Sequence, residues 1–208
     1  MTALLLTAAL LAAAQDKIEV DEKAGRLSFP AVALKTDLYA ELKGVIEYVL
    51  VNKGGKSYES LFESNVDGLA LHESLRKIGV VPGRPAREEN DRKYLPEGGQ
   101  VALFIEWKDG DKDRREPVET FVQDAKTGKP MASGAWFFTG SKKGYVPELE
   151  RQDLLVLATK NLVGLHHADP TPLLVNPAST PEAHRYSARP ETLLKAGSAV
   201  RIVMEAAR

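Results

Sequence analysis

The sequence predicts an α+β domain built on a mainly antiparallel sheet of about seven or eight strands, with one main helix packed on the sheet and long loops. Short apolar runs of strand length recur along the chain, one segment shows helical periodicity between capping residues, and no internal repeat is visible. An apolar fraction of 43% in 208 residues is enough for one hydrophobic core. We therefore expect a single domain over residues 17–206.

Residues 1–14, MTALLLTAALLAAA, are apolar or small and are followed by Gln15 and Asp16. This pattern is typical of an export signal that is cleaved after Ala14, and the run is too short to span a bilayer. We expect a mature protein in the periplasm or outside the cell, without a transmembrane segment. The alternative is a frayed N-terminal helix in a cytosolic protein.

Charge and cysteine content exclude several classes of partner and site. The 28 basic and 29 acidic residues nearly balance, so we expect no nucleic-acid partner; an unknown protein or small-molecule ligand stays open. The chain contains no cysteine, which excludes disulfides, thiolate metal sites and iron–sulfur clusters.

Two hairpins are expected in the first third of the chain. Alternating apolar and charged residues around a turn predict an antiparallel pair within 17–34. Residues 45–51 and 56–63 are apolar runs joined through Gly54 and Gly55, and two glycines suit a two-residue hairpin turn.

This second hairpin would fix the positions of two glutamates. If Lys53 pairs with Lys56, Glu59 lies opposite Leu50 on one face and Glu47 points to the other face. The two glutamates could then not act as a general acid/base pair.

One main helix is expected next. Asn65 or Asp67 can cap its N-terminus, and the helical pattern continues to about Ile78, where Gly79 ends it.

The rest of the chain is read as loops and strands. Residues 82–99 are rich in proline, glycine and charge and predict an exposed loop. Residues 160–195 are irregular and contain five prolines, which indicates a packed wrap or a site-forming loop. Five further strands are expected, at 101–107, 117–123, 134–139, 153–159 and 200–206.

Glu59 is the candidate catalytic residue. In the expected hairpin it lies among Leu50, Tyr48 and Leu61, and loss of solvent would raise its pKa and suit it to general acid or base catalysis. The alternative is a half-exposed glutamate with local hydrogen bonds.

A metal site is a second possibility. His166, His167 and Asp169 form a local group of potential ligands, and His72 could add to them, as could His184. No recognised ligand spacing supports the group, so the alternative is a loop whose histidines bond locally. No cofactor is predicted, although a divalent metal is possible.

Two further motifs offer weaker signals of ligand binding. Residues 140–144, GSKKG, carry amides and cations suited to an anion but lack the ending and context of a phosphate loop, so a turn is the expected structure. Trp107 and Trp136 fit core positions, and one exposed indole could stack on a sugar.

Several motifs together resemble the YdjY-domain family of exported bacterial proteins. They are KGGK followed by ESL within 53–61, the Pro-Gly pair at 82–83, and WFFTGS at 136–141, and the resemblance covers roughly residues 17–205. It implies a compact mixed domain and no established activity. Family members often carry histidine before ESL, where this chain has Tyr58, which weakens the case for an essential metal ligand there. The candidate ligand-binding residues in these motifs are Tyr58, Ser60, Trp136 and Ser141.

The leading hypothesis is an exported, non-enzymatic binding or scaffold module, because no complete catalytic motif is visible. The alternative is a metal-dependent hydrolase that uses Glu59 with the histidines and Asp169. A third hypothesis is carbohydrate binding through Trp107 or Trp136.

Overall fold

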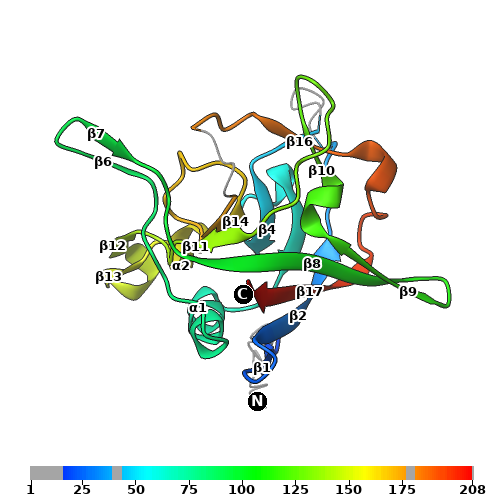
Figure 1. Ribbon diagram of the computed structural model, residues 1–208, viewed down its shortest axis with the longest axis horizontal. Helices are drawn as coiled ribbons and strands as arrows, with labels where there is room; N and C mark the ends of the chain where they lie inside the picture. Colours follow the sequence, from blue (N-terminus) through cyan, green and yellow to red (C-terminus); the bar gives the residue numbers. More distant parts are fainter. Residues whose placement is uncertain (1–15, 39–43, 177–180, 208) are drawn as a thin grey trace, which may run out of the picture.

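The computed structural model describes residues 16–38, 44–176 and 181–207, so the expected export signal at 1–14 lies outside the described residues. The expected α+β fold is wrong. Strands make up 44% and helices 15% of the described residues, in which eight strands close into a β-barrel with one main helix beside it (Figure 1).

The barrel is closed by pairing between its first and last members. The order is β2–β17–β8–β11–β15–β14–β4–β5, and β5 pairs back to β2 through Val32 with Glu63 and Ala33 with Phe62. An open sheet would leave two unpaired edges, which closure removes. The barrel strands are β2 (Arg26–Ala33), β4 (Tyr48–Asn52), β5 (Ser60–Ser64), β8 (Gly99–Asp109), β11 (Trp136–Phe138), β14 (Asn161–Gly164), β15 (Leu174–Val175) and β17 (Ala199–Ala206).

The expected hairpin at 45–63 is also wrong, because β4 and β5 run parallel. Tyr48 pairs with Ser60 and Leu50 with Phe62, whereas a hairpin would require the opposite direction. The barrel contains a second parallel pair, β14 with β15, and its other pairs are antiparallel.

The segment 53–59 returns the chain to the start of the neighbouring strand instead of turning it back. It ends in the short 3-10 helix η2 (Ser57–Glu59). Gly55 lets this segment pass closely over the chain, because a Cβ atom there would lie 2.9 Å from the carbonyl oxygen of Lys160. Gly54 has the positive φ of 87° that a local turn requires, whereas Gly55 serves a close passage that only the tertiary structure requires.

Two local predictions are confirmed. Strand β1 (Glu19–Asp21) forms an antiparallel pair with β2, as the sequence of 17–34 indicates. Helix α1 (Gly68–Lys77) begins after Asp67, whose side chain accepts a hydrogen bond of 2.8 Å from the amide of Ala70. It ends before Gly79, which has the positive φ of 89° that favours glycine.

Other elements differ from the expectation in type or position. The expected strand at 153–159 is divided between β13 (Arg151–Leu154) and a single helical turn, α2 (Val156–Thr159). The expected strand at 117–123 is a 3-10 helix, η3 (Val118–Phe121), followed by β10 (Val122–Asp124). The irregular stretch at 160–195 contains two barrel strands, β14 and β15, which are too short to stand out in the sequence.

The smaller elements surround the barrel. Strands β10, β16 (Tyr186–Ala188) and β3 (Val45–Ile46) form a three-stranded sheet. Strand β9 (Lys112–Pro117) extends the barrel from β8. Two hairpins project from the surface, β6 (Arg87–Glu89) with β7 (Arg92–Tyr94), and β12 (Lys143–Val146) with β13. Two further 3-10 turns are η4 (Pro147–Leu149) and η5 (Pro190–Thr192).

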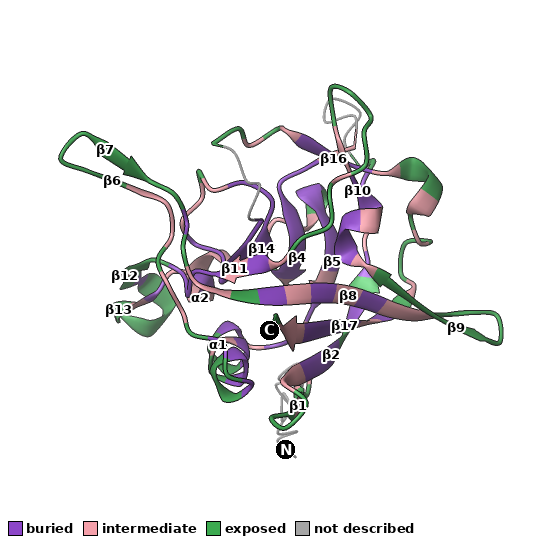
Figure 2. Cartoon of the chain, viewed as in Figure 1, coloured by how far each residue is buried: buried purple, intermediate pink, exposed green. Residues whose placement is uncertain are grey.

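The core fills the barrel and the space between the barrel and α1 (Figure 2). In β8 the buried residues alternate, Val101, Leu103 and Ile105, as a strand with one face inward requires. Helix α1 adds Leu71 and Leu75 from its inner face. No helix in the described part of the chain is long and apolar enough to cross a membrane.

Candidate functional site

The site begins with Glu47, which is the single residue between β3 and β4. Because β3 belongs to the three-stranded sheet and β4 to the barrel, Glu47 lies where the two sheets meet. Its backbone is fixed on both sides: its amide donates to the carbonyl oxygen of Glu59 at 2.9 Å, and its carbonyl accepts from the amide of Leu165 at 2.9 Å. The side chain of Glu47 is buried.

Lys56 joins Glu47 to Glu59. Its Nζ lies 2.9 Å from Glu47 Oε2 and 2.7 Å from Glu59 Oε1, and both carboxylates are buried. The parallel return of 53–59 brings Lys56 over the start of β4, where its Nζ also lies 5.5 Å from the centre of the Tyr48 ring. The expectation that Glu47 and Glu59 point to opposite faces is wrong, because it assumed the antiparallel register.

The environments of Glu47, Lys56 and Glu59 shift the pKa values of these three residues in different directions. Burial alone would raise the pKa of Glu47, but the neighbouring His166 and Lys56 outweigh it and hold that pKa at about 2. Burial raises the pKa of Glu59, and the neighbouring Glu47 adds to the rise while Lys56 opposes it. Burial would lower the pKa of Lys56, but the two carboxylates outweigh it and raise that pKa above its usual range. Glu47 and Lys56 are therefore a stable ion pair, and Glu59 is the carboxylate that takes up a proton more readily.

Two histidines flank Glu47. His166 follows β14, is 4% exposed, and places Nε2 3.7 Å from Glu47 Oε2, which is too long for a hydrogen bond. Neither ring nitrogen of this buried imidazole has a hydrogen-bond partner among the described residues. His184, on the segment before β16, places Nε2 3.9 Å from Glu47 Oε1, and its side chain is 67% exposed. We call Glu47, Lys56, Glu59, His166 and His184 the polar cluster.

A hydrogen-bonded network adjoins the polar cluster. Tyr48 donates to Asp169 Oδ2 at 2.7 Å, and the amide of Thr171 donates to Asp169 Oδ1 at 2.9 Å. Burial and the carboxylate of Asp169 raise the pKa of Tyr48. The rings of Tyr48 and His166 lie 6.1 Å apart. Both oxygens of Asp169 are occupied, so this carboxylate stabilises the loop after β14.

The candidate metal ligands are divided between two places. His166 lies in the polar cluster, and its chain neighbour His167 is half-buried on the same loop. His72 lies on α1, where its ring contacts Phe138 at 5.1 Å between ring centres. Within the described ranges, no group of three or more histidine, aspartate or glutamate side chains is arranged to hold a metal ion.

The candidate ligand-binding residues are also dispersed. Ser60 is buried beside the polar cluster and donates to the carbonyl oxygen of Lys56 at 2.7 Å, while Tyr58 is 39% exposed on η2. Trp136 is fully buried and donates from Nε1 to Glu119 Oε1 at 2.8 Å. Ser141 lies near α2, where its hydroxyl accepts from the amide of Val156 at 3.1 Å.

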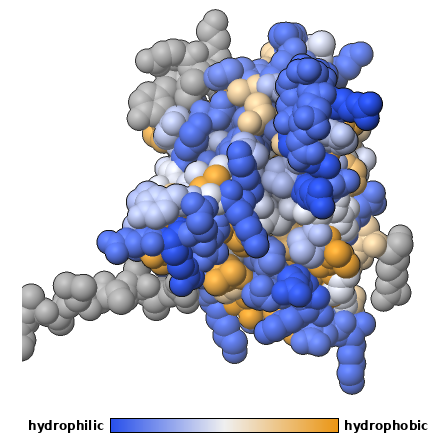
Figure 3. Space-filling view, turned by 90° about the vertical axis from the view of Figure 1, so that its left-hand side faces the viewer, coloured by the Kyte–Doolittle hydropathy of each residue, from blue (hydrophilic) through white to orange (hydrophobic). Residues whose placement is uncertain are grey.

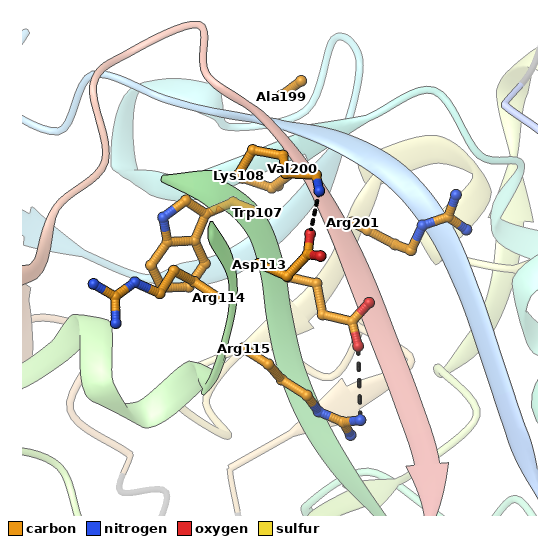
Figure 4. Close-up of a pocket in the computed structure, with 9 residues that line it drawn as sticks. Trp107, Lys108, Asp113, Arg114, Arg115, Ala199, Val200 and Arg201 are labelled. Atoms are coloured by element: carbon orange, nitrogen blue, oxygen red, sulfur yellow. Dashed lines mark ion pairs between the residues drawn. The ribbon is translucent and has the colours of Figure 1, made fainter. Parts of the chain in front are cut away.

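The two tryptophans differ in access. Trp136 cannot stack on a ligand without leaving the core. Trp107 lines an open cavity of about 450 Å³ between β8, β9 and β17, among charged side chains such as Arg114 and Arg115 (Figure 4). Its edge contact with Phe121, 5.8 Å between ring centres, holds the indole on the barrel wall.

Sequence reasoning missed Lys56 and the role of Glu47. The spacing of Lys56 and Glu59 was a usable signal, because residues three apart meet on one side of a helical turn. Nothing local indicates that Glu47 joins them, since that contact depends on the parallel pairing of β4 and β5.

Comparison with protein families gives one match. The model of the YdjY domain matches residues 18–205, which is most of the chain. No curated protein and no solved structure shows a significant match. The resemblance seen in the KGGK, ESL and WFFTGS motifs is therefore confirmed: the chain belongs to the YdjY domain family, whose function is unknown.

Proposed function

We propose that this domain is a non-catalytic binding module whose ligand occupies the polar cluster. The observation that carries the proposal is His166, a buried imidazole beside Glu47 with both ring nitrogens lacking hydrogen bonds among the described residues. Buried polar atoms in folded proteins are nearly always bonded, and one left unpaired costs about 1–3 kcal/mol. A ligand that bonds to His166 would recover this free energy.

Access to the polar cluster supports a small ligand. Glu47, Glu59 and His166 are buried, whereas the side chain of Lys56 is 42% exposed and that of His184 is 67% exposed. Solvent therefore meets the lysine and the outer histidine first. A ligand that enters there would meet an ammonium donor at Lys56 and an ionised carboxylate acceptor at Glu47. We infer a small polar molecule that carries both a hydrogen-bond donor and an acceptor.

The experiment compares His166→Phe with the wild-type protein, both purified without a histidine tag. Phenylalanine fills the space of the imidazole without its two nitrogens. If His166 serves a ligand, the variant should stay within about 0.5 kcal/mol of the wild type in free energy of unfolding without ligand, because removal of the unpaired polar atoms offsets the lost interaction with Glu47. Native mass spectrometry of freshly purified wild type should show a bound small molecule that the variant lacks.

A matched control is Tyr48→Phe, which removes a hydroxyl with a known partner, Asp169. This control should lose about 1 kcal/mol of stability. If His166→Phe loses as much or more, and both proteins carry the same bound species, the imidazole has a structural role and the binding proposal is wrong.

A metal-dependent hydrolase is the second candidate. Its support is the raised pKa of Glu59, which suits general acid catalysis, and the two histidines beside Glu47, with His166 Nε2 3.7 Å and His184 Nε2 3.9 Å from its carboxylate oxygens. Against it, these side chains are not arranged as a metal-binding group in the part of the chain that the structure describes. Lys56 counts against it, because its ammonium group already stands between the two carboxylates. Elemental analysis after dialysis against metal-free buffer and reconstitution with zinc tests it. Stoichiometric zinc that is lost in both His166→Phe and His184→Ala would favour the hydrolase over the non-catalytic module.

We propose further that the domain acts outside the cytoplasm, on the support of the sequence pattern of residues 1–14. The test is fractionation of cells that express the whole chain, followed by N-terminal sequencing. A processed N-terminus at Gln15 in the exported fraction is the expected result, and an intact N-terminus in the cytosol would contradict it.

A further inference from the structure

The proposed function leaves unexplained a groove that none of the residues of the polar cluster lines. It lies between α1, the segment 79–83 that follows α1, and the loop between β11 and β12 with the first residue of β12, Lys143, and its volume is about 710 Å³. Figure 3 shows the face of the molecule that carries α1 and the two projecting hairpins, where hydrophilic residues predominate with hydrophobic ones among them. A volume of this size is in the range of small-molecule sites.

The charged residues that line the groove have one sign. They are Arg76, Lys143 and, when protonated, His72, and no aspartate or glutamate lines it among the described residues. Glu73 lies outside the lining and contacts both Arg76 and His72 at 3.2 Å. These exposed ion pairs are weak, so an anion in the groove can compete for the cations.

His72 is oriented toward the groove. Its Nδ1 lies 3.2 Å from Glu73 Oε1 and its ring packs edge-on against Phe138, which fixes the direction of the imidazole. The other ring nitrogen, Nε2, faces Gly140: a Cβ atom at that glycine would lie 3.6 Å from it and 2.9 Å from Cβ of Pro82. Gly140 also has a φ of 79°, which disfavours other residues. The absence of a side chain at Gly140 thus lets Pro82 and the imidazole of His72 approach this loop closely.

Part of the groove lining is apolar. Val80, Val81, Pro82 and Leu154 line it, and Val81 is 70% exposed at the rim. A second cavity, of about 480 Å³, adjoins the groove across Ser141 and Lys143 and carries Arg84, Arg87 and Lys142, with Glu88 and Glu89 as its acidic residues. Basic side chains therefore flank the loop 140–143 on both sides.

We propose that this groove binds a small organic anion, in which a carboxylate or phosphate group meets Arg76, Lys143 and His72 and an apolar body covers Val81 and Leu154. Charge-assisted hydrogen bonds from arginine, lysine and histidine are the strong contacts of such sites. The apolar wall adds affinity that inorganic anions cannot gain.

The experiment follows the ring signals of the four histidines by ¹H–¹³C NMR during titration of the full chain. The probes are phenyl phosphate, benzoate, inorganic phosphate and benzyl alcohol, and His72→Gln assigns the signal of His72. Phenyl phosphate or benzoate should shift the His72 signal saturably while the His166 signal stays in place. Inorganic phosphate should bind more weakly, and benzyl alcohol should give no saturable shift. The stronger of the two organic anions identifies the head group.

Two double variants distinguish the effect of the side chains in the groove from the effect of the protein's net charge. Arg76→Gln with Lys143→Gln should weaken the binding of phenyl phosphate or benzoate by about tenfold or more. Lys77→Gln with Lys93→Gln removes the same formal charge from exposed positions outside the groove and should leave the dissociation constant within about twofold. Absence of a saturable shift at His72, an equal loss in both double variants, or an equal effect of benzyl alcohol would overturn the proposal. Because His166 is read in the same spectra, failure here is distinct from failure of the binding proposal for the polar cluster.

Discussion

The main-chain amide of Glu47 donates a hydrogen bond of 2.9 Å to the carbonyl oxygen of Glu59, and the side chains of the same two residues meet at Lys56. One backbone contact between the starts of two parallel strands therefore also gathers the charged groups of the polar cluster. The unusual parallel return of 53–59 and the candidate site are one structure. Changes at this place should affect stability and binding together.

Lys56→Met should destabilise the protein, because it leaves two buried carboxylates facing each other without a cation. Removal of one member of a fully buried ion pair costs about 3–5 kcal/mol. The side chain of Lys56 is 42% exposed, so water screens part of this effect and we expect about 2 kcal/mol at pH 7. Urea unfolding followed by tryptophan fluorescence measures it.

Two comparisons make the result for Lys56 specific. Lys53→Met, in the same segment but exposed, should stay within about 0.5 kcal/mol of wild type. Adding Glu59→Gln to Lys56→Met should recover part of the loss, since only one carboxylate then remains. If Lys56→Met and Lys53→Met lower the free energy of unfolding equally, the ion pairs of Lys56 are not the cause of the destabilisation.

Acid should destabilise the protein through Glu47. Its folded-state pKa of about 2 is below the ordinary value of 4.5, so its contribution is fully present above pH 4.5 and is lost as the pH falls toward 2. This shift in the pKa of Glu47 corresponds to a contribution of about 3 kcal/mol to the free energy of unfolding. Urea unfolding between pH 5 and 2 should show a steeper loss in wild type than in Glu47→Gln, whose amide does not titrate. Parallel curves for the two proteins would contradict the assignment.

Glu119 should contribute to stability with the opposite pH dependence from Glu47. Burial raises its pKa, although its bonds from Trp136 and Gly134 oppose the rise. A raised pKa favours folding below the ordinary value of 4.5, and this contribution is lost as the pH rises through the folded-state pKa. Glu119→Gln keeps an acceptor oxygen for Trp136 and does not ionise, so it should gain stability relative to wild type between pH 4 and pH 7.

The control at this position is Glu119→Leu, which removes the acceptor altogether. The buried indole N–H of Trp136 would then lack its partner at a cost of about 1–3 kcal/mol at any pH. Thermal or urea unfolding at pH 4 and pH 7 distinguishes the two variants. A glutamine variant as unstable as the leucine variant would show that the carboxylate itself is required.

Gly55→Ala should lower the free energy of unfolding, even though Gly55 is not one of the glycines with a positive φ. The added methyl group would lie 2.9 Å from the carbonyl oxygen of Lys160 and 3.1 Å from that of Asn52. Both contacts are to backbone, which cannot move aside easily, so we expect about 1–3 kcal/mol. A hairpin turn at this place would tolerate the alanine, and an unchanged urea midpoint would therefore argue against the parallel return of 53–59.

The elements that could be predicted are those whose signals are local. The cap at Asp67 and the stop at Gly79 specify α1 within a few residues of sequence, and the turn at 21–25 specifies the pairing of β1 with β2. The hairpin predicted at 45–63 is wrong because two adjacent glycines, Gly54 and Gly55, also suit a hairpin turn. Gly55 serves the close passage over the backbone of Lys160, a contact that no local pattern records.

Barrel closure was equally invisible in the sequence. It depends on the pairing of β2 with β5 and on the two short strands β14 and β15, one of four residues and one of two, within a stretch rich in proline. The predicted burial of Glu59 is confirmed, but its neighbours include Lys56 and, through Lys56, Glu47. His166 meets Glu47 only because β14 pairs with β4, so the polar cluster required the barrel before it could be recognised.

The position of β17 has a consequence for how the chain folds. This strand lies between β2 and β8 and pairs with both, so β2 gains its main neighbour only when residues near the far end of the chain arrive. Contacts between such distant parts of a sequence are slow to form, and proteins dominated by them fold in milliseconds to seconds. We therefore expect the barrel to close late, after α1 and the hairpin of β1 and β2 have begun to form. A chain that stops before residue 199 would be left with two open strand edges, on β2 and β8, available for pairing with other molecules.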